Sequence, residues 1–292
     1  MTGTDARTIL DGLHFAEGPR WRAGRVWFSD MHDHRVVSTD LGGDSRTEAR
    51  LDDDEPSGLG WLPDGRLLVV AMETQQLRRV EPDGSVSVHA DLSSVATGSL
   101  NDMIVAEDGT AYIGDMGQRI HEGGEMRPGR TFCVRPDGTW FVAAEDLASP
   151  NGHVLTPDEK TLLVAESGGG RITAFDRATD GTLSNRRVHV SLSPAPDGPA
   201  FAPPDGICLD RDGAVWVADP IGARVLRALP DGTTTDDHRF PGLIPVACVL
   251  AGEDRRTLVV CAASDWRRDV VRAARTGRLL ALDVDVPGCG KP

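Results

Sequence analysis

The chain has 292 residues and a formal net charge of −14, from 45 acidic and 31 basic side chains. This acidic balance is a poor match for phosphate backbones and anionic lipid surfaces, so it argues against nucleic-acid and membrane partners. The chain has no apolar run of the ~18 residues that a transmembrane helix needs, and its start lacks the pattern of a signal peptide. Five scattered cysteines without a C-x-x-C pair indicate a reducing compartment, so we expect a cytoplasmic protein.

Six similar units follow one another along the chain, starting near residues 15, 57, 100, 150, 204 and 246. Each unit opens with a short apolar stretch, turns, continues into a β-rich run and turns again near an Asp-Gly or similar pair. Residues 6–12 precede the first unit and look like a spare strand that completes the last one, which would remove an exposed sheet edge. The sequence therefore predicts one all-β domain over 1–292, a six-bladed β-propeller with four antiparallel strands per blade, closed by the N-terminal strand.

The β-runs between the turns support this prediction. Segments such as RLLVVAM, TAYIGD and AVWVADP are almost continuously apolar, as expected of strands that are buried on both faces. Asp-Gly pairs, for example Asp64-Gly65, favour hairpin turns because both positions tolerate positive φ. The best helix candidate is short, from Arg267 to Arg275.

Four of the six unit starts carry an oxygen-bearing side chain: Glu17, Asn101, Asn151 and Asp205. The first strand of each propeller blade lines the central channel, so these side chains should converge at one end of it. Two carboxylates and two amides are hard ligands that suit Ca²⁺, Mg²⁺ or Mn²⁺. The alternative is that Glu-Gly, Asn-Gly and Asp-Gly are ordinary turn dipeptides. We favour a metal site because all four occupy equivalent positions in a ring.

The same residues lie in motifs that resemble a known family. FAEGPRW at 15–21, LND at 100–102, SPNG at 149–152 and PDGICLD at 204–210 are similar to motifs of the senescence marker protein/gluconolactonase/luciferin-regenerating enzyme family. The resemblance implies a six-bladed propeller with one central divalent cation, Ca²⁺ first and Zn²⁺, Mn²⁺ or Mg²⁺ as alternatives. It further implies that Glu17, Asn151 and Asp205 bind the metal, that Asn101 contacts metal or substrate, and that Asp205 is the general base or nucleophile.

The predicted function is that of a metal-dependent hydrolase of the lactonase or esterase type, a monomer acting on a small molecule. Members of the family that act on sugar lactones often carry Arg two residues before the conserved Asn, where this chain has Ser99. We therefore expect a less hydroxylated lactone or ester as the substrate. Two alternatives use the same residues: a non-hydrolytic metal-dependent cyclase or isomerase, and a propeller that binds a small molecule without turnover.

Further candidates for substrate contact are Ser99, Asp115, Met116 and His153. His153 follows Asn151 by two residues, so strand alternation would aim both side chains at the same face. A structural role is the alternative for His153. Asp115, like Asp30 and Asp219, ends the second strand of its blade, where a repeated structural hydrogen bond is the favoured interpretation.

Three other patterns are expected to have no catalytic role. His32 and His34 form an H-x-H pair that resembles a metal motif, but they fall in an expected solvent loop without visible further ligands. The run Asp52 to Glu55 lacks the spacing of a calcium loop and predicts a solvated turn. Ala165-Glu166-Ser167-Gly168-Gly169 lacks the strand-to-helix context of a serine nucleophile elbow.

Overall fold

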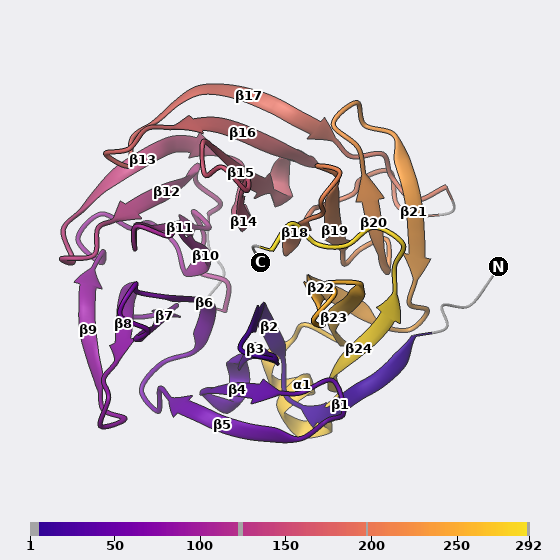
Figure 1. Cartoon of the computed structure of the whole chain (residues 1–292), viewed down its shortest axis with the longest axis horizontal. Helices are drawn as coiled ribbons and strands as arrows, with labels where there is room; N and C mark the ends of the chain where they lie inside the picture. Colours follow the sequence, from indigo (N-terminus) through magenta and orange to yellow (C-terminus); the bar gives the residue numbers. More distant parts are fainter. Residues whose placement is uncertain (1–5, 122–124, 197, 291–292) are drawn as a thin grey trace.

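The computed structural model describes residues 6–121, 125–196 and 198–290. Figure 1 shows the described chain as a ring of blades around a central axis. Each blade is one four-stranded antiparallel sheet, and there are six of them, which confirms the predicted β-propeller. Residues 1–5, which belong to the segment inspected for a signal peptide, lie outside the described residues. Among the described residues, no helix reaches the length and apolarity that a membrane crossing needs.

The strands follow the blades in chain order. Blade 1 contains β2 (Ala16–Arg22), β3 (Arg25–Asp30), β4 (Arg35–Thr39) and β5 (Ser45–Arg50), and blade 2 contains β6 (Pro56–Trp61), β7 (Leu67–Ala71), β8 (Gln76–Val80) and β9 (Val86–Asp91). Blade 3 contains β10 (Leu100–Val105), β11 (Ala111–Asp115), β12 (Gly129–Val134) and β13 (Trp140–Leu147), and blade 4 contains β14 (Pro150–Leu155), β15 (Thr161–Glu166), β16 (Arg171–Arg177) and β17 (Leu183–Ser191). Blade 5 contains β18 (Ile207–Leu209), β19 (Val215–Asp219), β20 (Arg224–Ala228) and β21 (Thr234–Arg239), and blade 6 contains β22 (Ile244–Ala251), β23 (Thr257–Ala263), β24 (Gly277–Asp283) and β1 (Arg7–Leu13).

Short helices occupy three of the connections. The 3₁₀ turn η1 (Met31–Asp33) joins β3 to β4, and η2 (Ser167–Gly169) joins β15 to β16. The helix α1 (Arg268–Ala274) joins β23 to β24 and lies within the segment predicted to be helical. Because strands alternate in direction, the connection between the second and third strands lies at the same end of the ring as the start of the first strand. All three helical segments are therefore at the end where the inner strands begin.

The N-terminal strand closes the ring, as the sequence predicts. β1 pairs antiparallel with β24, so residues from both ends of the chain share blade 6. Figure 1 shows β1 beside β24, at the junction between blade 6 and blade 1. This pairing leaves β24 with partners on both sides, and the short connection from β1 to β2 then joins the last blade to the first.

The core consists of apolar layers between neighbouring blades, with second strands such as β7 and β19 completely buried. One layer, for example, joins β10, β11 and β12 of blade 3 to β7, β8 and β9 of blade 2. Cys208, Cys248 and Cys261 belong to these layers as free thiols, which confirms the prediction that they are core residues.

Candidate active site at the start of the inner strands

The side chains of the four predicted unit starts come together at the end of the channel where the inner strands begin. Asn101 Nδ2 donates a hydrogen bond to Asn151 Oδ1 at 3.0 Å, which links blades 3 and 4. Asn101 Oδ1 accepts one at 2.9 Å from Ser57 Oγ of blade 2. Asn151 also bonds the Asp205 side chain, and the Asp205 carboxyl interacts electrostatically with Glu17. Residues from five blades therefore form one polar group around the axis.

The two carboxyl groups of this site are poorly solvated. Burial raises the pKa of Glu17 to about 8, and Asp102 adds to this rise while the Gly18 amide and Arg20 oppose it. Burial also raises the pKa of Asp205, and repulsion from Glu17 raises it further against the hydrogen bond from Asn151. Two such carboxylates that repel each other need a nearby positive charge before both can ionise.

A local irregularity of the inner strands aims these side chains at the axis. β2 has a register shift against β3 between Glu17 and Arg20, and β6, β10, β14 and β22 have similar shifts near their starts. Such bulges redirect side chains next to active sites. The Gly that follows a unit start permits close blade packing. A Cβ on Gly152 would lie 2.7 Å from the Asp205 carbonyl oxygen. The Asn-Gly pair of blade 4 is therefore part of a bulged strand, where a simple turn had been the alternative.

An ion pair beneath the site was not predicted from the sequence. Arg20 donates to Asp102 Oδ1 at 2.8 Å, and both side chains are buried. Arg20 also donates to the carbonyl oxygens of Pro19 at 2.9 Å and Leu59 at 3.2 Å, and to that of Met103. The other Asp102 oxygen accepts the His153 backbone amide at 3.1 Å. The pair therefore ties blades 1, 2, 3 and 4 together below Glu17.

The donor set fits one divalent cation. When ionised, Glu17, Asp102 and Asp205 carry three negative charges, and Arg20 carries one positive charge. The group then has a net charge of two negative charges close together, which a divalent cation would balance. The side-chain oxygens of Glu17, Asp205, Asn101 and Asn151 are hard donors of the kind that Ca²⁺ prefers.

The four predicted substrate contacts have different surroundings. Met116 is partly exposed, and its sulfur lies 3.5 Å from Asn101 Nδ2. Ser99 is buried and donates to Glu73 Oε1 at 2.9 Å. His153 is also buried, with Nδ1 2.5 Å from the Asn151 carbonyl oxygen and Nε2 3.1 Å from Thr131 Oγ1. Burial lowers the pKa of His153 to about 4, so its ring is neutral at pH 7.

Asp115 belongs to a set of acids that end the second strands and hold the loops entering the first strands. Its Oδ2 accepts the Thr97 amide and its Oδ1 the Gly98 amide, each at 2.8 Å. Asp30 accepts two amides in the same way, and Glu166 of β15 accepts the Ala148 amide at 2.8 Å. For Asp30 and Asp115 these are the structural hydrogen bonds favoured from the sequence, whereas Asp219 accepts the Gly222 amide and pairs with Arg224, each at 2.8 Å. The bonds of Asp30, Asp115 and Glu166 fix the chain immediately before the site residues.

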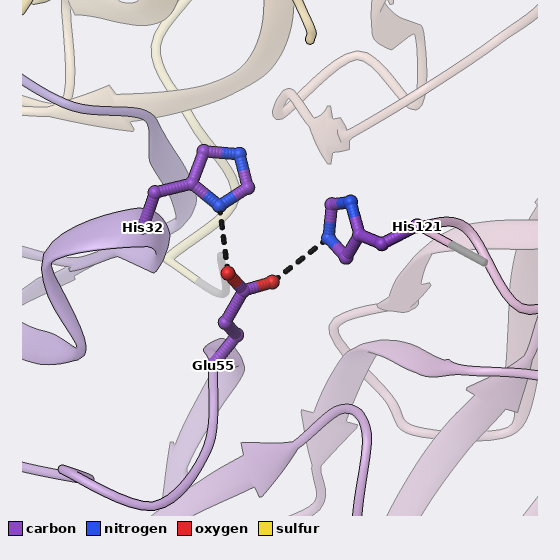
Figure 2. A group of neighbouring side chains, drawn as sticks. All are labelled: His32, Glu55 and His121. Atoms are coloured by element: carbon purple, nitrogen blue, oxygen red, sulfur yellow. Dashed lines mark hydrogen bonds and ion pairs between the residues drawn. The ribbon is translucent and has the colours of Figure 1, made fainter. Parts of the chain in front are cut away.

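A second polar group lies at the same end of the ring. Figure 2 shows the Glu55 carboxylate between the rings of His32 and His121. His32 Nδ1 is 3.0 Å from Glu55 Oε1, and His121 Nε2 is 2.8 Å from Glu55 Oε2. Two expectations from the sequence were wrong here. His32 is buried and does not lie in a solvent loop, and Asp54 and Glu55 are buried although Asp52 and Asp53 are exposed.

Arginines of α1 also reach this carboxylate. Arg268 lies 2.7 Å from Glu55 Oε2, and Arg272 lies 3.5 Å from Glu55 Oε1. Burial opposes ionisation of Glu55, but the contacts with His121, His32 and Arg268 outweigh it and lower its pKa. Burial also lowers the pKa of His32, partly offset by Glu55. Glu55 therefore joins loops of blades 1, 2, 3 and 6 above the channel.

Two other features contribute no side chain to the candidate site. The segment around Ser167 runs from a strand through η2 into a strand, and Ser167 Oγ donates to the Pro204 carbonyl oxygen at 2.6 Å. This is not the strand-to-helix context of a nucleophile elbow. A cavity of about 480 Å³ opens where the inner strands end and includes Trp21, Trp61 and Arg255 among its lining residues. It is therefore at the opposite end of the channel.

Comparison with known proteins places this geometry in a family. The family described as "SMP-30/Gluconolactonase/LRE-like region" matches residues 15–264. Regucalcin of Xenopus laevis is 30% identical over 287 residues, covering 94% of each chain. The 6-deoxy-6-sulfogluconolactonase of Pseudomonas putida is 29% identical over 153 residues, which is 52% of this chain and 51% of that protein. The match to this last relative therefore spans only about half of its length.

Solved structures agree with this result. The calcium-binding protein regucalcin of Agrobacterium tumefaciens superposes with a TM-score of 0.80 at 21% identity, covering 100% of this chain and 99% of that one. A gluconolactonase of Xanthomonas campestris superposes with a TM-score of 0.73 at 27% identity, covering 97% and 90%. The motifs, the six blades and these matches together show that the chain belongs to the SMP-30/gluconolactonase/LRE-like family.

Proposed function

We propose that the protein is a divalent-metal-dependent hydrolase that opens a small lactone, or a related ester, at the group formed by Glu17, Asn101, Asn151 and Asp205. The observation that carries this proposal is the pair of mutually repelling carboxyl groups of buried Glu17 and half-buried Asp205, beside the amide side chains of Asn101 and Asn151. Relatives named gluconolactonase, pentonolactonase and sulfogluconolactonase support the lactone as substrate.

We assign the metal to Glu17, Asn151 and Asp205, with Asn101 contacting either the metal or the substrate, and we expect Ca²⁺. A bound divalent cation would polarise the lactone carbonyl and stabilise the oxyanion that develops on it. Asp205 is the proposed general base, because its carboxylate is held beside the site by Asn151 and can take a proton from the attacking water. The water oxygen then adds to the carbonyl carbon, the ring C–O bond breaks, and Asp205 returns the proton to the leaving oxygen, which gives the hydroxy acid.

The substrate side of the site is proposed to be less polar than in sugar lactonases. Ser99 stands where those family members carry Arg, and its hydroxyl is already bonded to Glu73. Met116 presents a thioether beside Asn101. His153 and Asp115 would hold neighbouring site residues in place without contacting the substrate, since their polar atoms are hydrogen-bonded inside the protein. We expect a monomer that acts on a lactone with few hydroxyl groups.

The test is hydrolysis of a lactone and ester panel with Ca²⁺, Mg²⁺, Mn²⁺ or Zn²⁺ added to metal-free protein. Asp205→Asn should abolish turnover, whereas Asp231→Asn, in an exposed turn, is the matched control and should retain it. Metal-independent turnover, or an active Asp205→Asn variant, would overturn the assignment. A strong kinetic preference for gluconolactone over simple γ- or δ-lactones would refute the less polar substrate but leave the hydrolase in place.

A further inference from the structure

The group formed by His32, Glu55 and His121 has the composition of a metal site that is separate from the central one. It offers two imidazole nitrogens and one carboxylate oxygen, and these ligand atoms all lie within 4.8 Å of one another. Three loops contribute, since His32 lies in η1, Glu55 precedes β6 and His121 lies between β11 and β12. Figure 2 shows both rings turned toward the same carboxylate.

The contacts of this group leave ligand capacity unused. Glu55 Oε2 and His121 Nε2 are 2.8 Å apart, yet neither of these buried atoms has an aligned hydrogen bond among the described residues. The Glu55 side chain is 2% exposed, so water does not readily compensate for this. Because these two atoms are not committed to an aligned hydrogen bond with each other, their lone pairs can turn toward a cation when the pair opens.

We propose that His32, Glu55 and His121 form a second metal site, which takes one Zn²⁺ or a similar first-row cation in competition with Arg268. Imidazole nitrogens favour such cations over Ca²⁺, whose ligands are oxygens. Zinc binds nitrogen and carboxylate oxygen at about 2.0–2.2 Å, so its ligand atoms are roughly 3.4 Å apart. The contacts at 2.8 and 3.0 Å would open by about half an ångström, and the widest separation, at most 4.8 Å, would close by up to about 1.4 Å. The remaining coordination position is left for water.

Arg268 accounts for the arrangement of the metal-free group. Its guanidinium lies 2.7 Å from Glu55 Oε2 and supplies the positive charge that the buried carboxylate needs. The Arg268 side chain is 35% exposed and comes from the short helix α1, so it can move into solvent. A bound cation and this guanidinium would repel each other, and therefore only one of them can hold Glu55 at a time.

The experiment uses protein in which Glu17→Gln and Asp205→Asn remove the central carboxylates. Equilibrium dialysis with Zn²⁺, followed by elemental analysis, should give one ion per chain, and Co²⁺ should give the visible absorption of a nitrogen-ligated site. His121→Ala should weaken binding at least about tenfold. His121 is chosen because it lies at the rim and its loss should leave the fold intact, which thermal unfolding checks. Arg268→Gln should strengthen binding roughly tenfold.

His34→Gln is the matched control, because His34 bonds the Asp54 carbonyl oxygen and approaches Arg272, outside the group. It should leave zinc binding unchanged. The proposal fails if the central-site variant binds no Zn²⁺, if His121→Ala binds as tightly as its parent, or if Arg268→Gln weakens binding. The variant used for zinc binding lacks the central carboxylates. Failure to bind Zn²⁺ would therefore not count against the proposed hydrolase, and failure of the hydrolase test would not count against the second metal site.

Discussion

The ion pair between Arg20 and Asp102 should be essential for stability because it is buried beneath a cluster of acids. Replacing Arg20 with Met keeps much of the side-chain volume but removes the partner of Asp102 Oδ1 at 2.8 Å. It also removes donors from the carbonyl oxygens of Pro19, Leu59 and Met103. Breaking one side of a buried pair typically costs about 3–5 kcal/mol, because a charge remains buried without compensation.

Asp102→Asn provides the second side of a double-mutant cycle. In the double variant no carboxylate is left unpaired, so its destabilisation should be smaller than the sum of the single effects by roughly 2–3 kcal/mol. Urea unfolding in the presence of a chelator would measure all four proteins. Strictly additive effects, or an Arg20→Met variant within about 1 kcal/mol of the parent, would refute this reasoning.

The same cycle also reports on the charge balance of the site. Arg20→Met leaves the carboxylates of Glu17, Asp102 and Asp205 without the neighbouring guanidinium. A divalent cation should therefore raise the unfolding free energy of Arg20→Met more than that of the parent protein. An equal or smaller gain would show that Arg20 does not offset the charge of these acids.

Three further predictions rest on buried groups elsewhere. Glu166→Gln should destabilise the protein at pH 7, because hydrogen bonds and Arg171 lower the pKa of Glu166 against its burial. The loss of unfolding free energy should shrink as the pH falls below about 4, which urea unfolding at several pH values would measure. Gly206→Ala should cost about 1–3 kcal/mol in thermal unfolding, since its Cβ would lie 2.5 Å from that of Ala247, and an unchanged melting temperature would contradict the close approach. In native alkylation followed by mass spectrometry, only the partly exposed Cys289 should react, because the other four cysteines are buried; rapid labelling of one of those four would contradict this.

The fold was predictable because its signals are local and repeated. Asp-Gly turns and apolar runs recur in each unit, and a ring of equivalent strands makes Glu17 and Asp205 neighbours without any contact information. The closing strand followed from one unpaired β-run before the first unit. These inferences required only the period of the repeat and the rule that the inner strands of all blades start at the same end of the central channel.

The unpredicted residues depend on contacts that no local pattern encodes. Asp102 was overlooked because strand alternation places neighbours on opposite faces, whereas the register shift between Leu100 and Met103 lets both Asn101 and Asp102 take part in the buried site. The inference for His153 relied on the same alternation, which a shift in β14 interrupts. Glu55 was interpreted as part of a charge run, but loops from other blades bury it.

The closing strand β1 has a consequence for synthesis of the protein. Arg7 pairs with Ala281, so β1 must wait until the last blade has been synthesised before its partner exists. Five blades can form during translation, but the ring can close only after release of residues 277–283. Until then β1 and the growing sheets expose unpaired edges, which makes the interval before closure the period of greatest risk of aggregation.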